Sequence, residues 1–143
     1  MSASSACTPE TIDLTGLWRL VAVTNWTNGV MTNPHAMGSR PGGYINYAPA
    51  EGRMMVVLDW RSVEPTAKSQ FGHNAVVAYA GRFTRNGAKV THHLEMCTNA
   101  EDVGGDYVRI IEVQGENLFL CTEPVTRGDK TYVSKLEWTR DMG

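Results

Sequence analysis

Apolar and polar residues alternate with a period of two along most of this chain. Successive side chains on a β-strand point to opposite sides, so this alternation predicts strands that bury one face. No segment carries an apolar stripe with helical spacing over four turns. The pattern predicts an all-β protein with strands at Trp18–Thr27, Tyr44–Ala48, Arg53–Trp60, Ala75–Thr84, Lys89–Cys97, Asp106–Val113, Asn117–Cys121 and Thr131–Thr139.

Turn-forming residues separate most of these segments, at 49–52, 86–87, 104–105, 114–117 and 127–129. Asn86-Gly87 is the sharpest signal, because this dipeptide suits the two-residue turn of an antiparallel hairpin. Evenly spaced strands without crossover helices predict an antiparallel meander that closes on itself. At 143 residues the chain fits one domain. We therefore expect a flexible tail over residues 1–13 and a single small β-barrel with an apolar central cavity over 14–143.

The two ends of the predicted wall carry complementary residues. Gly16-Leu17-Trp18 opens the first strand, and Trp138-Thr139-Arg140 closes the last. Period-two counting places Trp138 and Arg140 on one face, where the guanidinium can cover the Trp18 ring as a cation–π contact. This pairing predicts that the strands form a ring with one sealed end, the floor.

The alternation also assigns side chains to the interior or to the outer surface. On the second, sixth and seventh strands the assignment stays open. There Asp106 and Glu112 favour an exposed Arg109, whereas a ligand-binding interior can hold its charge. On the other five strands the expected inward residues are Trp18, Leu20, Ala22, Thr24, Trp26, Met54, Val56, Leu58, Trp60, Val77, Tyr79, Gly81, Phe83, Val90, His92, Leu94, Met96, Tyr132, Ser134, Leu136 and Trp138.

Two connections, Asn28–Gly43 and Arg61–Asn74, are longer than a hairpin needs. With the floor at Trp18, both should lie at the open mouth of the barrel. Connections of this length act as lids over a site or are merely mobile. The second has room for one short helix over residues 66–71.

Composition and charge narrow the classes of partner. Charged residues make up 20% of the chain, the net charge is −2 and the pI is near 6.1. Because no run of Lys or Arg is present, we expect neither nucleic acid nor a membrane as a partner. Residues 1–9 lack the apolar core of a signal peptide, and the three cysteines have no metal-binding spacing. These features predict a cytoplasmic protein with reduced thiols and no cofactor.

His92 is the sharpest candidate for chemistry, because it is the titratable group on an otherwise apolar inward face. Desolvation lowers the pKa of a buried imidazole, which leaves it neutral and able to act as a base or a hydrogen-bond donor. The alternative is a core histidine satisfied by a Tyr hydroxyl or a carbonyl. Tyr79 and Ser134 offer inward hydroxyls and complete the candidate catalytic set.

A wider set of residues could bind a ligand, although core packing is the simpler role for most of them. The aromatic rings in this set can stack on a ligand, and the methionine side chains can adapt to an irregular ligand shape. The set also includes one arginine. No metal is expected, because the adjacent His92 and His93 point to opposite sides of one strand. The candidate binding residues are Thr24, Trp26, Tyr44, Met54, Val56, Leu58, Trp60, Leu94, Met96, Arg109 and Tyr132.

Five stretches between Leu14 and Arg140 resemble the lipocalin-like domain family of small bacterial and fungal proteins. They are LTGLWRLV at 14–21, GYINY at 43–47, AYAGRF at 78–83, VTHHLE at 90–95 and LEWTR at 136–140. The resemblance implies a barrel of about eight strands with an apolar cavity. Relatives of this fold in secondary-metabolite pathways act as cofactor-free cyclases and isomerases, including pericyclases, and others only carry ligands. Family members often have a longer helical insert before the fourth strand, where this chain is short.

We therefore expect a cofactor-independent isomerase or cyclase, with pericyclases as one type, that folds a hydrophobic secondary-metabolite intermediate inside the barrel. His92 and a Tyr or Ser hydroxyl would move a proton or polarise a carbonyl. One alternative is a carrier in which the same groups only anchor a small hydrophobic ligand. Another is an interaction protein with a filled interior. A homodimer is the protein partner that the sequence leaves open.

Overall fold

The computed structural model describes residues 7–59 and 76–141. These ranges hold strands and one short 3₁₀ helix, and within them no helix is long and apolar enough to span a membrane. The all-β class is therefore confirmed. The elements are β1 (Gly16–Thr27), β2 (Val30–Asn33), β3 (Gly42–Ala48), β4 (Arg53–Asp59), β5 (Val76–Asn86), β6 (Lys89–Cys97), η1 (Ala100–Asp102), β7 (Asp106–Gln114), β8 (Asn117–Thr122), β9 (Val125–Arg127) and β10 (Lys130–Arg140).

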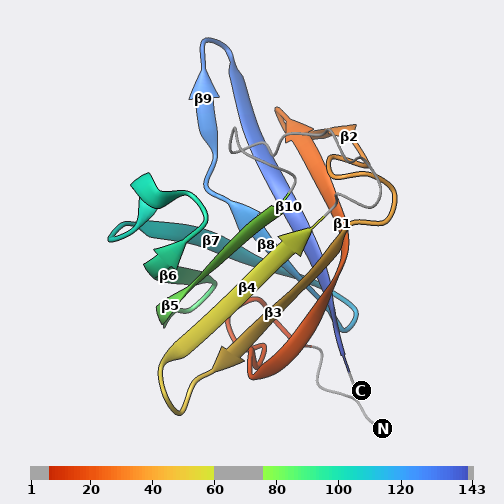
Figure 1. The fold of residues 1–143 in the computed structure, drawn as a ribbon. Coiled ribbons are helices and arrows are strands. Elements are labelled where there is room, and N and C mark those ends of the chain that lie inside the picture. Colours follow the sequence, from red (N-terminus) through yellow and green to blue (C-terminus); the bar gives the residue numbers. More distant parts are fainter. Residues whose placement is uncertain (1–6, 60–75, 142–143) are drawn as a thin grey trace, which may run out of the picture.

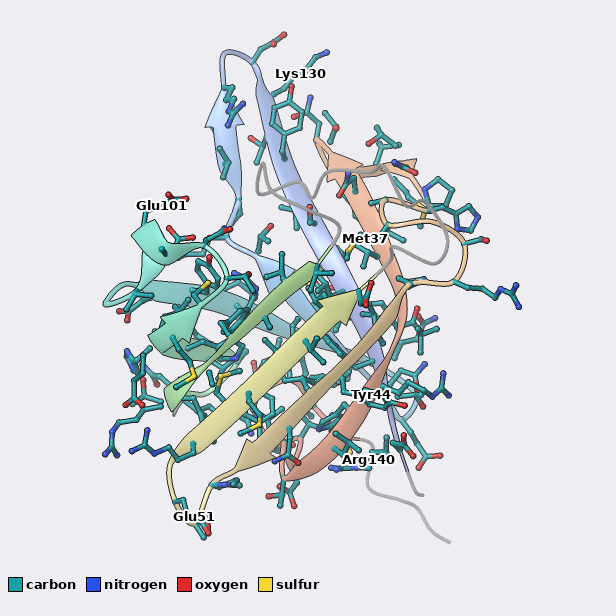
Figure 2. The ribbon with its side chains drawn as sticks, in the orientation of Figure 1. Met37, Tyr44, Glu51, Glu101, Lys130 and Arg140 are labelled. Carbon is teal, nitrogen blue, oxygen red and sulfur yellow. The ribbon has the colours of Figure 1, made fainter. Side chains whose placement is uncertain are left out.

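Eight of the strands close into one antiparallel barrel (Figure 1). The order around the wall is β1-β3-β4-β5-β6-β7-β8-β10, and β10 pairs with β1 to complete the ring. The start of β1 and the end of β10 lie at one end of the barrel, which Glu51 and Arg140 mark in Figure 2. Lys130 marks the opposite end, the mouth. The predicted eight-stranded meander is confirmed.

The strands β2 and β9 extend the sheet at the mouth and were not expected from the sequence. They pair with β1 and β10 and hold four and three residues, too few for alternation to show. Asn28 and Gly29 connect β1 to β2, with φ of 51° and 78°. Two successive positive φ values define the turn that Asn-Gly favours. This dipeptide is the signal that could have located β2. The other long connection, Arg61–Asn74 with its expected short helix, lies outside the described residues.

The floor is sealed as the sequence predicts. Trp18 and Trp138 are fully buried there, and the Arg140 guanidinium lies 4.1 Å from the centroid of the Trp18 ring. The same guanidinium donates hydrogen bonds to the backbone oxygens of Thr15 and Asp13. The last strand is thus fastened to the segment before the first, which closes the ring at this end.

Removing the Arg140 guanidinium should loosen the floor. Arg140→Ala deletes a cation–π contact and two charge-assisted hydrogen bonds, so we expect the free energy of unfolding to fall by about 1 to 2 kcal/mol. Urea unfolding followed by tryptophan fluorescence measures this loss. Arg127→Ala, on an exposed position of β9, is the matched control and should change stability by less than about 0.5 kcal/mol. Equal losses in the two variants would contradict a role of Arg140 in the floor.

A β-bulge in β1 overturns part of the predicted interior. The pairing of β1 with β10 shifts at Val21, and Val23 is fully buried beyond it. A bulge adds one residue to a strand and therefore exchanges the inward and outward faces that follow. Thr24 and Trp26 were predicted to point inward, and this is wrong: they lie on the outer face. There Lys135 Nζ sits 4.3 Å from the centroid of the Trp26 ring.

A second bulge, in β6, moves Met96 to the outside. The pairing of β6 with β5 shifts at Glu95. Gly81 permits this close approach, because a Cβ at that position would lie 1.9 Å from the backbone oxygen of His93. Met96 is 63% exposed, so its predicted inward position is wrong, and Cys97 packs against the core instead.

The structure decides the strands whose parity the sequence left open. On β3, Ile45 and Tyr47 point inward and are buried, while Tyr44 points outward and is 44% exposed. Tyr44 is therefore not an interior binding residue. On β7, Arg109 and Ile111 are the buried pair. The polar pattern that favoured a surface position for Arg109 was misleading.

Candidate functional site

Three hydrogen-bonded side chains from three strands meet in the barrel interior. The Tyr47 hydroxyl of β3 lies 2.5 Å from His92 Nε2, and the Tyr79 hydroxyl of β5 lies 3.0 Å from His92 Nδ1. All three residues are buried, with Tyr47 and His92 each 1% exposed. We call this arrangement the Tyr–His–Tyr chain. It links β3 to β5 and β6, with β4 between them in the wall, so it forms only when these four strands curve around one interior.

Burial sets the protonation states of this chain. Desolvation, followed by the positive charge of Arg109, lowers the pKa of His92 to about 3. Desolvation likewise raises the pKa of Tyr47 and of Tyr79 above the ordinary value. A neutral imidazole has one N–H and one lone pair, so one tyrosine donates to His92 and the other accepts from it. The accepting hydroxyl keeps its own proton available for a further partner.

The neutral state of His92 makes stability sensitive to acid. Its folded pKa of about 3 lies below the ordinary value of 6.5, so between these values the unfolded state binds the proton and the folded state does not. The stability that depends on a neutral His92 is complete above pH 6.5, and it is lost as the pH falls toward 3. Between pH 7 and 5, the free energy of unfolding should fall by about 2 kcal/mol more in the wild type than in His92→Gln. Urea unfolding at each pH measures this difference, and parallel pH profiles would contradict it.

Arg109 brings a positive charge into the same interior. It is 8% exposed, and its Nη1 donates to the backbone oxygen of Val108 at 3.0 Å. Its guanidinium lies 5.3 Å from the centroid of the Tyr107 ring, and that ring meets the Tyr79 ring edge-on at 5.0 Å. The Tyr107 ring thus lies between the cation and the Tyr–His–Tyr chain.

A polar group near the mouth fixes the far end of Tyr107. Its hydroxyl donates to the Asp102 carboxylate of η1, and the Cys97 sulfur lies 3.8 Å from the same hydroxyl. Burial, followed by the hydrogen bond to Asp102, raises the pKa of Tyr107. Tyr107 is therefore a neutral donor whose ring orientation is held from both sides.

The structure brings two of the three predicted catalytic residues together. Tyr79 and His92 share a hydrogen bond, whereas Ser134 is on β10, across the ring from β5. The Ser134 hydroxyl donates to Asn25 Oδ1 at 2.8 Å. Tyr132, on the same strand, is 40% exposed. Ser134 and Tyr132 thus belong to the β1–β10 side of the mouth.

The predicted binding residues divide between the interior and the outer face. Trp60 lies outside the described residues. Sequence reasoning missed Tyr47 and Tyr107, although an outward Asn46 on β3 would have placed Tyr47 inside. Residues that are buried in the interior as expected are Met54, Val56, Leu58 and Leu94, and residues on the outer face are Thr24, Trp26, Tyr44 and Met96. Arg109, whose orientation the sequence left open, is buried as well.

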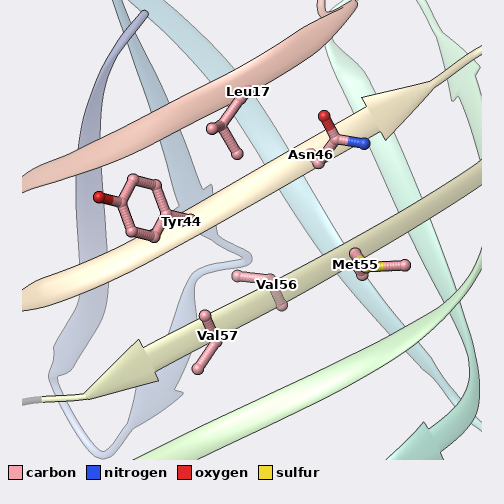
Figure 3. Close-up of a pocket in the computed structure, with 6 residues that line it drawn as sticks. All are labelled: Leu17, Tyr44, Asn46, Met55, Val56 and Val57. Carbon is pink, nitrogen blue, oxygen red and sulfur yellow. The ribbon is translucent and has the colours of Figure 1, made fainter. Parts of the chain in front are cut away.

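Tyr44 lines a shallow apolar groove of about 220 Å³ on the outside of the barrel (Figure 3). Leu17 of β1 and Met55 and Val57 of β4 form its other sides. A second groove of about 420 Å³ continues from Met55 across β5 to Met96. These hollows lie on the outer surface, so the apolar central cavity stays a prediction. A single chain does not test the homodimer, which also stays a prediction.

A sealed, eight-stranded antiparallel barrel with polar groups inside defines the class of lipocalin-like barrels, a fold suited to the binding of small ligands. The model of the lipocalin-like domain family matches residues 15–141, and the chain belongs to this family. The resemblance seen in the sequence is thereby confirmed. The comparisons with curated proteins and with solved structures gave no match.

Proposed function

We propose that the protein is a cofactor-independent isomerase or cyclase for a small hydrophobic molecule that carries a carbonyl or enol oxygen. The Tyr–His–Tyr chain is the observation that supports this proposal most. It presents a tyrosine hydroxyl with a free proton among apolar side chains. In such surroundings a hydrogen bond to a carbonyl oxygen is stronger than in water, because the local dielectric is low.

The protonation states favour polarisation of a carbonyl over full proton transfer. His92 has a pKa of about 3 and is therefore a weak base at neutral pH. Burial raises the pKa of Tyr79, so its hydroxyl keeps its proton. We assign the tautomer in which His92 Nδ1 carries the hydrogen, so that the Tyr79 hydroxyl accepts from His92 and is free to donate to a substrate. His92 would hold that hydroxyl in place while the substrate rearranges. Of the two roles expected from the sequence, moving a proton and polarising a carbonyl, the proposal therefore takes the second.

The apolar side chains that line the interior would supply the remainder of the rate acceleration. Met54, Val56, Leu58 and Leu94 surround the interior with hydrocarbon and thioether surface. A flexible substrate held there in one reactive conformer loses its entropy on binding instead of in the transition state. Cyclisation and pericyclic rearrangement need no more than this constraint and one polarising donor.

Matched tyrosine variants test the proposal. The probes are conjugated polyene ketones whose ultraviolet absorbance changes when the polyene cyclises. The wild type should accelerate conversion above buffer, and Tyr79→Phe should slow it by at least about tenfold with little change in Kd, because the donor acts on the transition state. Tyr44→Phe, on the outer face, is the control and should be unchanged. Equal rates in wild type and Tyr79→Phe would contradict the role of the donor.

A carrier is the second candidate, and one observation favours it. Both ring nitrogens of His92 are already bonded to tyrosines, so the chain is complete without a ligand. A carrier would bind the same ketones with measurable affinity and convert none of them. Binding without turnover across the whole panel would therefore support transport and overturn the enzyme.

A further inference from the structure

The ion pairing of the described residues leaves one interior cation uncompensated. Carboxylates on the outer face pair with Arg53, Arg82, His93 and Lys135. Within residues 7–59 and 76–141, none of them pairs with Arg109, which is nine-tenths buried. Buried charges in proteins are as a rule paired, because their desolvation is otherwise costly. The unpaired state of Arg109 therefore calls for an explanation.

The donor groups of Arg109 are mostly unused. A guanidinium has five N–H donors, and in the described part of the chain one nitrogen reaches a protein acceptor, the backbone oxygen of Val108. The ring of Tyr107 covers one face of the group and holds it in the interior. In the same set of residues, Trp138 Nε1 is a second buried donor without an acceptor. The interior thus offers N–H groups that lack a matching oxygen.

We infer that the ligand carries an anionic oxygen group, a carboxylate or its enolate equivalent, that binds to Arg109. This inference rests on the proposed function, because it assigns the substrate class of the same interior. A planar guanidinium matches a carboxylate in a two-point contact, which is stronger and more directional than a contact to a neutral carbonyl. The Tyr107 ring packs against both Arg109 and Tyr79, so an anion bound to Arg109 would lie one aromatic side chain away from the Tyr–His–Tyr chain.

Matched acids and esters test the assignment. The probes are cis-parinaric acid and its methyl ester, with polycyclic aromatic acids and their methyl esters, followed by fluorescence. The acids should bind the wild type at least about tenfold more tightly than the esters. Arg109→Gln should abolish this preference by weakening the acids alone. Arg127→Gln removes the same charge from the exposed β9 and should retain the preference.

Two results would overturn the inference in distinguishable ways. If acids and esters bind the wild type equally, the anionic class is wrong while the proposed binding of an apolar molecule stands. If no probe of either kind binds, the proposed function fails as well.

Thermal unfolding gives an independent readout. Arg109→Met replaces an unpaired buried charge with an apolar side chain of similar length, so the ligand-free Tm should rise by about 3 °C. The polyene acid should raise the Tm of the wild type and not that of this variant, because a ligand stabilises only the state that binds it. A lower Tm together with retained stabilisation by the acid would overturn the inference.

Discussion

Gly81→Ala should lower the free energy of unfolding by about 3 kcal/mol or more. The added Cβ would lie 1.9 Å from the backbone oxygen of His93 and 3.0 Å from the backbone nitrogen of Glu95. Real Cβ atoms essentially never approach another atom within 3.0 Å, and backbone atoms in a paired strand cannot rotate away. The strands β5 and β6 must therefore separate at the bulge.

The same change should disturb the interior, because Tyr79 and His92 are on these two strands. Urea unfolding measures the stability, and the affinity for cis-parinaric acid reports on the interior. Gly105→Ala is the control: its Cβ would lie 3.2 Å from the Asp102 backbone oxygen, which needs a shift of only a few tenths of an ångström. We expect it to change stability by less than about 1 kcal/mol. Similar losses in the two variants would contradict the requirement for glycine at the bulge.

His92→Leu should lower the free energy of unfolding by about 3 kcal/mol and abolish turnover of the ketone probes. The leucine fills a similar volume but leaves the hydroxyls of Tyr47 and Tyr79 buried without their partner. Each unsatisfied buried group costs about 1 to 3 kcal/mol. Denaturant unfolding measures the loss of stability, and ultraviolet absorbance follows turnover.

Removing the two hydroxyls should rescue stability but not activity. In the His92→Leu background, Tyr47→Phe with Tyr79→Phe eliminates the unsatisfied groups, so we expect about 2 kcal/mol to return. Turnover should stay absent, because no donor remains. If the losses of the three substitutions simply add, the residues do not act as one hydrogen-bonded chain.

The strands and the closure of the barrel could be predicted from the sequence because their signals are local or terminal. Alternation reports which segments have one buried face, whatever they pair with. The floor was predictable for a related reason. Trp18 is near the start of the chain and Arg140 is near its end. Because a guanidinium and an indole ring attract each other, their residue types alone predict that they meet. His92 and Tyr79 were found inside because each shares its strand with buried apolar neighbours.

The full set of inward residues depended on pairing that only the tertiary structure decided. The bulges at Val21 and Glu95 arise where a neighbouring strand shifts its register, and a one-residue shift exchanges the two faces of everything beyond it. Counting along the sequence therefore assigned Trp26 and Met96 to the wrong side.

The polar interior was decided in the same way. Tyr47 and Arg109 lie on strands whose two faces are both part apolar, so local alternation cannot choose between them. In the barrel both residues point inward, and Tyr47 meets His92 across β4 and β5. Alternation thus determined where this protein has strands and a floor, because it is a property of each strand alone. The partners of His92 and the place of Arg109 are properties of the closed barrel, in which distant strands share one interior.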